Sequence, residues 1–226
     1  MSNTNLTGAD LTDADLSYAE LKGIITDENT KMQIPEKPSK EIALNFLKEG
    51  NIDKWNRWKS EHQEEELNLS DIDLTETNLS GVNLSGANLT GANLSDANLT
   101  GADSINADLT DADLTGADLT NANLIRADLR STILSEDTTI DDKWRLVWDI
   151  VNHSIQGRDL INADLSDANL TGADSINADL SNADLSGATL WDADLSGADL
   201  TNADLTDANL EGIITDENTK IEIPEE

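Results

Sequence analysis

The chain has 226 residues, no cysteine, and a formal net charge of −32 that arises from 46 acidic and 14 basic residues. Disulfides and thiolate metal sites are therefore excluded, and such a charge repels nucleic acid and anionic lipid while it attracts basic partners. Aromatic residues make up 3% and hydrophobic residues 37% of the sequence, which argues against a large mixed core. Low aromatic content with high charge is typical of disordered chains, but the apolar residues here recur with a fixed period.

The N-terminal residues Met1–Leu6 contain no basic segment followed by an apolar run, so no signal peptide is predicted. No stretch approaches the ~18 apolar residues that a membrane span needs. We therefore expect a soluble protein of the cytoplasm.

A five-residue unit recurs along most of the chain: Ala, then Asn or Asp, then Leu, then Ser or Thr, then a variable residue that is often Gly. Taking the Leu as the central residue, four units lie in residues 1–25 (block A), fourteen in 67–134 (block B) and eleven in 158–212 (block C). The central residue is Leu in 27 of these 29 units, and Ser104 and Ser175 replace it in the other two.

A period of five fits neither an α-helix nor a β-strand, so each unit must contain a regular turn. The Leu and the Ala two residues before it must share the interior, where only a small residue fits beside Leu. The Asn or Asp between them and the following Ser or Thr must point outward. Gly at the variable position suits a turn with positive φ.

The units resemble the A(D/N)LXX motif of the pentapeptide repeat family, as in Ala92–Asp96 and Ala198–Asn202, and the match covers about two thirds of the chain. The resemblance implies an all-β solenoid, a right-handed quadrilateral β-helix with four units per coil. The 29 units would then build about seven coils, or a rod of roughly 35 Å if it is continuous. The amino-acid sequence of Lys143–Asn152 is similar to segments of cyanobacterial members of the family.

On this fold, residues twenty apart stack, so that Leu69, Leu89, Leu109 and Leu129 form one interior column. Ser104 falls within another column and would place a hydroxyl or a small void inside. Both serines lie in the same decapeptide, TGADSINADL. Duplication explains the pair, and a buried water or ligand site is the alternative.

Each block is followed by a similar segment, which we predict leaves the coil and folds over its open end. The three exit segments are Ile25–Met32, Ile133–Ile140 and Ile214–Ile221, and the nine residues of Gly23–Lys31 and Gly212–Lys220 are identical.

Helices are expected between the blocks. One covers residues 40–49, with Ser39 as N-cap and Gly50 ending it. A second, shorter helix carries Trp55 and Trp58. A third covers residues 142–152, with Asp141 as N-cap. The first helix is expected to turn Ile42, Ala43, Phe46 and Leu47 inward, and the third has an apolar stripe of Trp144, Val147, Trp148 and Val151.

The predicted organisation is a single repeat coil with its exit segment over 1–34, a helical insertion over 35–66 and a repeat solenoid over 67–140. A cap helix follows over 141–157, and a second solenoid with its exit segment over 158–226. We favour interrupted stacks whose starts are covered by helices over one continuous rod with the helices looped out sideways.

Acidity is concentrated in the repeats. Block B carries ten acidic and two basic residues, and residues 158–210 carry eleven and one, whereas residues 26–66 hold seven of the fourteen basic residues. Outward carboxylates stacked about 5 Å apart repel by ~1 kcal/mol or less per pair in water.

No catalytic, cofactor or metal site is predicted. The only histidines, His62 and His153, lie outside the repeats and lack metal-ligand spacing. Carboxylate pairs occur throughout the repeats, so no pair is singled out for acid–base chemistry. The protein is therefore expected not to be an enzyme.

The leading hypothesis is a structural or protein-interaction solenoid that presents an acidic, Asp/Asn-lined surface. Its partner would be an unknown, basic protein, with nucleic acid and membranes not expected and an end-to-end dimer left open. The candidate partner-binding residues are Trp55, Trp58, Trp144, Trp148, Trp191, Asp103, Asp108, Asp113 and Asp118. Trp191 stands alone in the repeats, directly after a central Leu, and is predicted to face outward.

Two alternatives are weighed against it. Some pentapeptide repeat proteins mimic DNA and bind DNA gyrase, and this chain shares their acidity but not their Phe-rich central positions, since its one Phe is Phe46. Rows of Asp or of Ser and Thr could also bind calcium weakly or bind ice, although the glycine-rich nonapeptide of calcium-binding β-rolls is absent.

Overall fold

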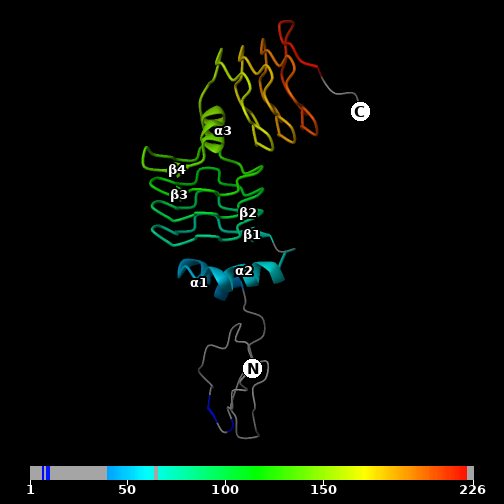
Figure 1. Cartoon of the computed structure of the whole chain (residues 1–226). Helices are drawn as coiled ribbons and strands as arrows, with labels where there is room; N and C mark the ends of the chain where they lie inside the picture. Colours follow the sequence, from blue (N-terminus) through cyan, green and yellow to red (C-terminus); the bar gives the residue numbers. More distant parts are fainter. Residues whose placement is uncertain (1–6, 8, 11–39, 64–65, 223–226) are drawn as a thin grey trace. The chain divides into compact units, whose positions relative to one another are not determined.

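The computed structural model describes residues 7, 9, 10, 40–63 and 66–222 (Figure 1). The chain divides into two compact units, Met1–Gln63 and Glu64–Glu226. Block A beyond its few described residues, its exit segment, the N-cap residue Ser39 and the side chain of Ile42 lie outside the described part. None of the helices in that part is long and apolar enough to span a membrane.

The first unit contains two helices that pack together, α1 (Lys40–Lys48) and α2 (Ile52–Glu61). Gly50, with φ of 66°, ends α1 as predicted, because the amide of Asn51 can then turn back to the carbonyl of Phe46 at 2.7 Å. The side chains of Ala43, Phe46 and Leu47 are buried, as expected.

The expectation that the second helix is the shorter one was wrong, since α2 has ten residues and α1 has nine. The helix α2 continues past Trp58 for one further turn. An (i, i+4) pair of Arg57 and Glu61, at 3.5 Å, lies on this turn and favours its helical form.

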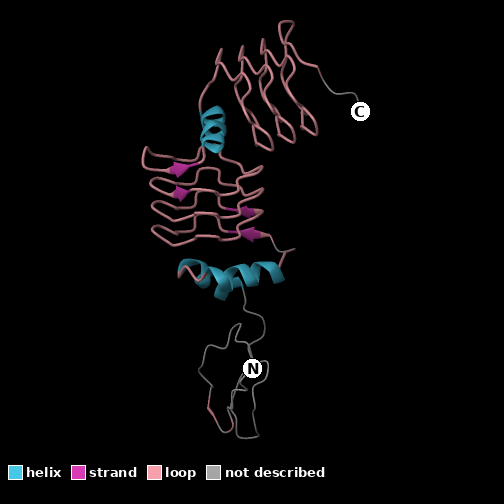
Figure 2. Cartoon of the chain, in the orientation of Figure 1, coloured by secondary structure: helices cyan, strands magenta, loops and turns pink. Residues whose placement is uncertain are grey.

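The second unit is built mainly from stacked coils (Figures 1 and 2). Parallel bridges join residues twenty apart, from Asp73 with Asn93 in block B to Thr189 with Asn209 in block C. Four five-residue units therefore complete one coil, as predicted. In two places the bridges extend over two consecutive residues and form short parallel strands. There β1 (Leu67–Asn68) pairs with β2 (Ala87–Asn88), and β3 (Asp118–Leu119) pairs with β4 (Thr139–Ile140).

The interior of the coils consists of the central Leu and the Ala two residues before it. Leu84, Leu89, Ala92 and Leu94, for example, are 0% exposed. Ser104 and Ser175 are also buried, at 4% and 5% exposed, so both hydroxyls lie inside the stack, as expected. The narrow interior explains why Ala and Leu alternate there, because a larger residue in the place of Ala would overpack the coil.

The variable position forms the corners of the coil and has positive φ, as predicted for its glycines. Asp and Asn also occupy these corners. The carboxylate of Asp71 lies over Gly91, one coil further on, where an added Cβ would come within 2.7 Å of its Oδ1 atom. Asp96 faces Gly116 in the same way, so at these two corners the Asp side chain fills the space that a Cβ on the next corner would need.

Helix α3 (Asp142–Asn152) follows block B with the predicted bounds. Its buried residues are Trp144, Val147 and Ile150, so the predicted stripe through Trp148 and Val151 was wrong by a rotation of the helix. Trp148 is only half-buried, because its indole Nε1 reaches out to donate to the carbonyl of Thr132 at 3.0 Å.

Asp141 precedes α3 at the predicted N-cap position, but its side chain makes no capping hydrogen bond to the helix. Its Oδ1 atom instead accepts from the backbone amide of Asn121, a corner of the last coil of block B, at 3.3 Å. The exposed amide at the end of the coil therefore takes the acceptor that the sequence pattern assigned to the helix.

Candidate interaction surfaces

The Asp and Asn side chains before the central residues form the turns of the coil. Each of them from Asn68 to Asn209 in blocks B and C accepts, through Oδ1, a hydrogen bond from the backbone amide two residues later at 2.9–3.4 Å. This is an Asx turn, which both Asp and Asn can make. In several units the hydroxyl of the following Ser or Thr donates to the same oxygen, as Thr201 does to Asp199 at 2.5 Å. The motif therefore has a structural role before it can have a binding role.

The predicted acidic residues of block B do not lie together on one face. Asp103, Asp108, Asp113 and Asp118 are five residues apart, so each lies on a different side of a twenty-residue coil. All four are half-buried and accept an Asx-turn hydrogen bond. Along the stack, Asn residues separate many of the carboxylates, as where Asn88 pairs with Asp108 and Asn98 with Asp118. The most strongly acidic surface of the repeats is therefore elsewhere.

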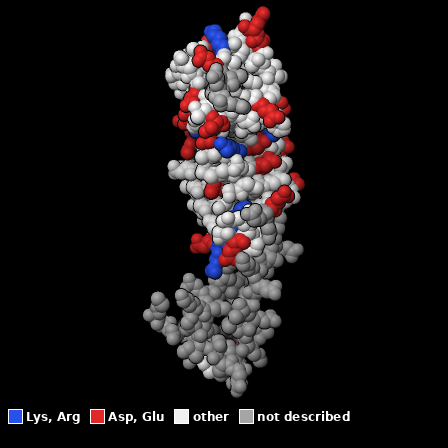
Figure 3. Space-filling model, turned by 90° about the vertical axis from the view of Figure 1, so that its right-hand side faces the viewer, with Lys and Arg blue, Asp and Glu red and all other residues white. Residues whose placement is uncertain are grey.

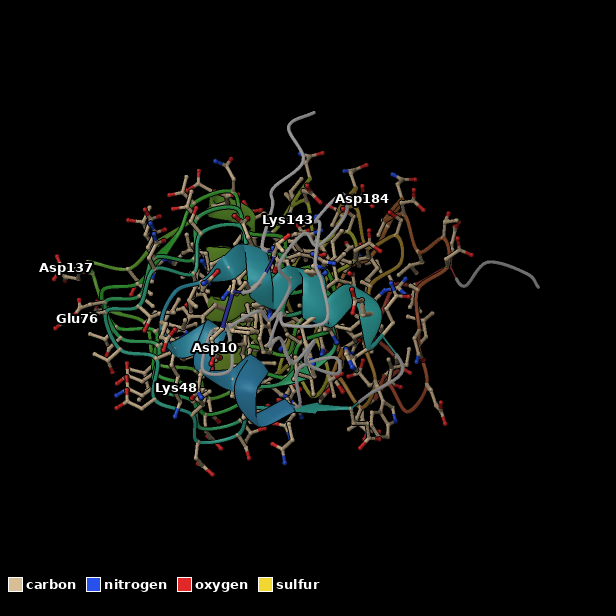
Figure 4. All side chains as sticks on the ribbon, turned by 90° about the horizontal axis from the view of Figure 1, so that it is seen from below. Asp10, Lys48, Glu76, Asp137, Lys143 and Asp184 are labelled. Carbon is tan, nitrogen blue, oxygen red and sulfur yellow. The ribbon has the colours of Figure 1, made fainter. Side chains whose placement is uncertain are left out.

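Carboxylates do line up along block C. Parallel bridges join Asp159 to Asp179 and Asp179 to Asp199 on one side of the coils, and a second column lies on the adjacent side. That second column consists of Asp164, Asp184 and Asp204, and Asp184 projects outward (Figure 4). The space-filling view shows acidic side chains spread over the face it presents, with few basic ones among them (Figure 3). We call the two columns together the acidic columns; their six residues are Asp159, Asp179, Asp199, Asp164, Asp184 and Asp204.

Two lysines already bind to the acidic columns. The ammonium of Lys143, at the start of α3, donates to Asp164 Oδ1 at 2.9 Å and to Ser166 Oγ at 2.7 Å. The ammonium of Lys220, in the last exit segment, donates to Asp199 Oδ2 at 2.5 Å. The carboxylate of an Asx turn of block C can therefore accept from a lysine side chain, and at Asp164 the hydroxyl of Ser166 is a second acceptor.

Hydrogen bonds lower the pKa of three carboxyl groups of the columns, those of Asp164, Asp199 and Asp204. The hydrogen bond from Lys220, followed by those from Thr201, lowers the pKa of Asp199 to about 2. The side-chain and backbone hydrogen bonds of Thr206 lower the pKa of Asp204. Burial raises the pKa of Asp164, but the hydrogen bonds from Lys143 and Ser166 outweigh this, so the net shift of its pKa is downward. These hydrogen bonds therefore favour the charged form of Asp164, Asp199 and Asp204.

The first three candidate tryptophans are core residues. Trp55 and Trp58 are 0% and 1% exposed, and their ring centroids lie 5.5 Å apart. Trp58 also stacks on the ring of His62 at 4.6 Å. Trp144 is 7% exposed, and the Lys143 ammonium lies 5.0 Å from its ring centroid. The role that the structure assigns to these three rings is packing, as their apolar surface favours.

Trp191 is 50% exposed, which confirms the predicted outward orientation. It follows the central Leu190, where most units have Ser or Thr, and its backbone carbonyl remains in the ladder by accepting from Gly172 at 2.8 Å. The indole is therefore not needed to build the coil. Partner binding through Trp191 or the half-buried Trp148 stays a prediction.

The two histidines make local contacts. His62 Nδ1 lies 2.8 Å from the carbonyl of Trp58, and His153 Nδ1 lies 3.1 Å from Asp149 Oδ1. Within residues 7, 9, 10, 40–63 and 66–222, no group of three or more His, Cys, Asp or Glu side chains is arranged to hold a metal ion.

The end of block B, which we call the closed end, has an acceptor for each of its four corner amides. Gly116 donates to Ser135 Oγ at 3.1 Å, in the exit segment, and Asn121 donates to Asp141. The remaining two donate to groups beyond the exit segment. The amide of Arg126 donates to the carbonyl of Asp167 at 2.8 Å, and the amide of Ser131 donates to Asn152 Oδ1 at 2.5 Å.

Helix α3 completes the closed end, over which it lies (Figure 1). Asn152 Nδ2 donates to the carbonyl of Leu129 at 2.9 Å, and Arg145 donates to the carbonyl of Thr138 at 2.6 Å. No parallel bridge joins block B to block C in the described part of the chain. The two blocks contact each other through Arg126 and Asp167 and through α3, and their organisation as interrupted stacks stays a prediction.

The end of block C, which we call the open end, has the same exit segment but no helix after it among the described residues. Thr219 Oγ1 donates to the carbonyl of Leu195 at 3.1 Å, as Thr138 Oγ1 does to Leu114 at 2.8 Å. Gly197 donates to Asp216 Oδ1 at 2.8 Å. The other three corner amides, of Asn202, Asp207 and Gly212, have no acceptor among the described residues.

Stacked coils of four five-residue units, with Asx turns outside and Leu and Ala inside, define this chain as a repeat protein. It belongs to the pentapeptide repeat family. Eight copies match the family model "Pentapeptide repeats", over residues 1–25, 68–103, 105–136, 155–185 and 178–214. None of the curated proteins compared with the chain matches it.

Solved structures of cyanobacterial pentapeptide repeat proteins are similar in sequence. The chain is 35% identical to alr5209 from Nostoc PCC 7120, with 35% of this chain and 73% of that one covered and a TM-score of 0.27. It is 29% identical to HetL from Nostoc sp. strain PCC 7120, a protein involved in regulating heterocyst differentiation, with 94% and 87% covered and a TM-score of 0.32. It is 28% identical to Rfr23 from Cyanothece 51142, with 74% and 97% covered and a TM-score of 0.21.

Proposed function

We propose that the protein is a non-catalytic, protein-binding scaffold whose coils form a right-handed quadrilateral β-helix and whose acidic columns bind a basic protein. The two docked lysines carry this proposal. Lys143 and Lys220 lie on Asp164 and Asp199, which are members of different columns, and the contacts use side-chain oxygens that every similar turn of block C presents.

The acidic columns are suited to this role because they are held in place. One carboxylate oxygen of each Asp is fixed by the Asx turn, so binding a lysine or arginine costs little further side-chain ordering. The spacing of the coils, ~4.8 Å along each column, would allow a basic segment to contact successive turns. Such contacts are charge-assisted hydrogen bonds and are weakened by salt.

The test is affinity capture from the source cell with a charge-neutralised protein. Asp179, Asp184 and Asp204 are replaced by Asn, which keeps the Asx turn but removes three charges. The control carries the same replacement at Asp103, Asp113 and Asp118 in block B. We expect wild-type protein and the control to capture the same basic protein in low salt, and the block C variant to lose it.

Equal capture by the two variants, or capture that high salt does not release, would contradict the proposal. The DNA-mimic and calcium alternatives stay predictions, and a supercoiling assay with DNA gyrase and calorimetry with Ca²⁺ address them in turn.

A further inference from the structure

We infer that the open end of block C is a docking site for an amphipathic, tryptophan-bearing helix of a partner protein, which binds there as α3 binds to the closed end. This inference rests on the proposed function, because it names a second surface and a partner element for the same scaffold.

The two ends match residue by residue at a separation of 81 positions. Gly116 corresponds to Gly197, and the exit-segment threonine Thr138 corresponds to Thr219. The equivalent groups make the same hydrogen bonds: Leu114 and Leu195 each accept from the exit threonine through the backbone carbonyl. At both ends the exit segment accepts from the glycine corner of the last coil, Gly116 or Gly197. The other three corner amides do not donate to the exit segment in the described part of the chain.

At the closed end that remaining part is contacted by α3 and, at the Arg126 corner, by block C, and the coil beneath them is buried. Leu124, Ala127 and Leu129 are 1%, 1% and 2% exposed. At the open end the corresponding Ala208 and Leu210 are half-buried. Leu205, which corresponds to Leu124, is 4% exposed, so the additional apolar surface of the open end is centred on Ala208 and Leu210.

The polar groups of the open end are unpaired in the same pattern. Its corner amides of Asn202 and Gly212 have no acceptor among the described residues. The corresponding amides of the closed end donate to Asp141 and Asn152, the residues at the two ends of α3. A helix with an Asp before its first turn and an Asn in its last turn would therefore satisfy both groups.

Charge favours such a helix over a second copy of this chain. Asp207, Glu211, Asp216 and Glu217 lie at or beside the open end, and a second copy would bring a chain of net charge −32 to them. Helix α3 instead carries Arg145 in its first turns, and this arginine donates to the carbonyl of Thr138 in the exit segment of the closed end. We therefore expect a partner helix with basic residues near its N-terminus and an apolar stripe of the Trp144, Val147 and Ile150 type.

The probe is a synthetic, fluorescein-labelled peptide with the sequence of residues 141–154, titrated with the full-length protein and followed by fluorescence anisotropy. We expect saturable binding that the Leu210→Asp variant weakens by at least about tenfold, because it places a charge on the apolar surface. A second variant, Ala208→Lys, should act in the same direction. The matched control is Ile161→Asp, which changes an isoleucine that is 43% exposed elsewhere in block C and should leave binding unchanged.

A peptide with Trp144→Ala and Ile150→Asp tests the stripe and should not bind. To avoid dependence on the helicity of a free peptide, the same segment is also attached after Glu226 through a flexible linker. We expect it to raise Tm by about 3 °C relative to the stripe-broken extension.

Absence of both effects, or equal loss of binding in Leu210→Asp and Ile161→Asp, would overturn the inference. Dimerisation that Leu210→Asp abolishes, without peptide binding, would assign the open end to a second copy instead. The variant with Asp179, Asp184 and Asp204 replaced by Asn should still bind the peptide. Loss of cellular capture in that variant and loss of peptide binding in Leu210→Asp thus report separately on the proposed function and on the docking site.

Discussion

The closed end of block B and the open end of block C have similar exit segments but differ in what covers the rest of the last coil. Both have a glycine corner, an exit segment and a threonine that donates back to the last coil. Among the described residues, only the closed end has a helix over the rest of its last coil, which block C also contacts through Asp167. The comparison separates two tasks: the exit segment terminates the ladder of hydrogen bonds, and the helix removes apolar surface from water.

The largest expected difference between the two ends is the cost of truncating equivalent leucines. Leu129→Ala should lower the free energy of unfolding by about 3 kcal/mol because the side chain is fully buried, and Leu210→Ala by about 1 kcal/mol because it is half-buried. Urea unfolding followed by circular dichroism measures both values. Equal losses would show that the open end is covered in solution.

The next effect isolates the polar contacts of α3. Asn152→Ala removes the acceptor of the Ser131 amide and a donor to the Leu129 carbonyl, which should lower the free energy of unfolding by about 1–3 kcal/mol. The control is Asn218→Ala in the last exit segment, whose exposed side chain donates only to Asp216 at 3.4 Å. Its effect should stay within about 0.5 kcal/mol, and a larger one would mean that the exit segments are not comparable.

A smaller difference is expected between the two exit threonines. Thr138→Val should cost about 1–2 kcal/mol, because Thr138 is 4% exposed and its hydroxyl satisfies both the Leu114 carbonyl and the Ser135 amide. Thr219→Val should cost about half as much, since water can replace the hydroxyl at a half-buried site. Thermal unfolding of the two variants in one buffer is the measurement, and a larger cost at Thr219 would contradict the distinction.

The smallest effect concerns acid stability. The pKa of Asp199 is about 2 in the folded protein, below the unfolded value of about 3.9. Its contribution to stability is therefore present above about pH 4 and is lost as the pH falls through about 2. Asp199→Asn keeps the Asx turn but loses this contribution, so stability should change less between pH 5 and 2 than in the wild type.

The closed end provides the control for this measurement, because Asp118 corresponds to Asp199 and has Thr139 where the open end has Lys220. The hydrogen bonds from Thr120 lower the pKa of Asp118 as well, but no lysine is among the causes. Asp118→Asn should therefore alter the pH dependence less than Asp199→Asn. The reverse order, in acid titrations followed by circular dichroism, would show that the Lys220 contact is not formed in solution.

Much of the coil could be read from the sequence, because its determinants are local. The period of five, the inward Leu and Ala and the positive φ of the corner glycines all follow from a single unit and its neighbours. The bounds of α3 also followed, since its apolar period and flanking residues lie within one segment. The sequence did not reveal that the Asp and Asn side chains build the turns, although the recurrence of Asp or Asn directly before the central residue in most units was the available signal.

The candidate site was predicted less well. Four acidic residues of block B were grouped by their spacing in the sequence, yet a twenty-residue coil sends them to four sides. The acidic columns of block C required the register of one coil on the next. Trp144 and Trp148 belong to one helix, but which of them is buried depended on how α3 lies against block B, and local periodicity does not contain that information.

The sequence alone determined that this chain forms coils and which side chains lie inside them, because a repeated unit imposes the same steric and hydrogen-bonding choice at each step. The sequence also predicted the exit segments, but tertiary structure alone decided which other groups contact the last coil of each block. At the closed end, backbone amides of the last coil donate to side chains of a later segment: Asn121 donates to Asp141 and Ser131 donates to Asn152. Those choices depend on which groups meet in space, where desolvation makes an unpaired amide costly.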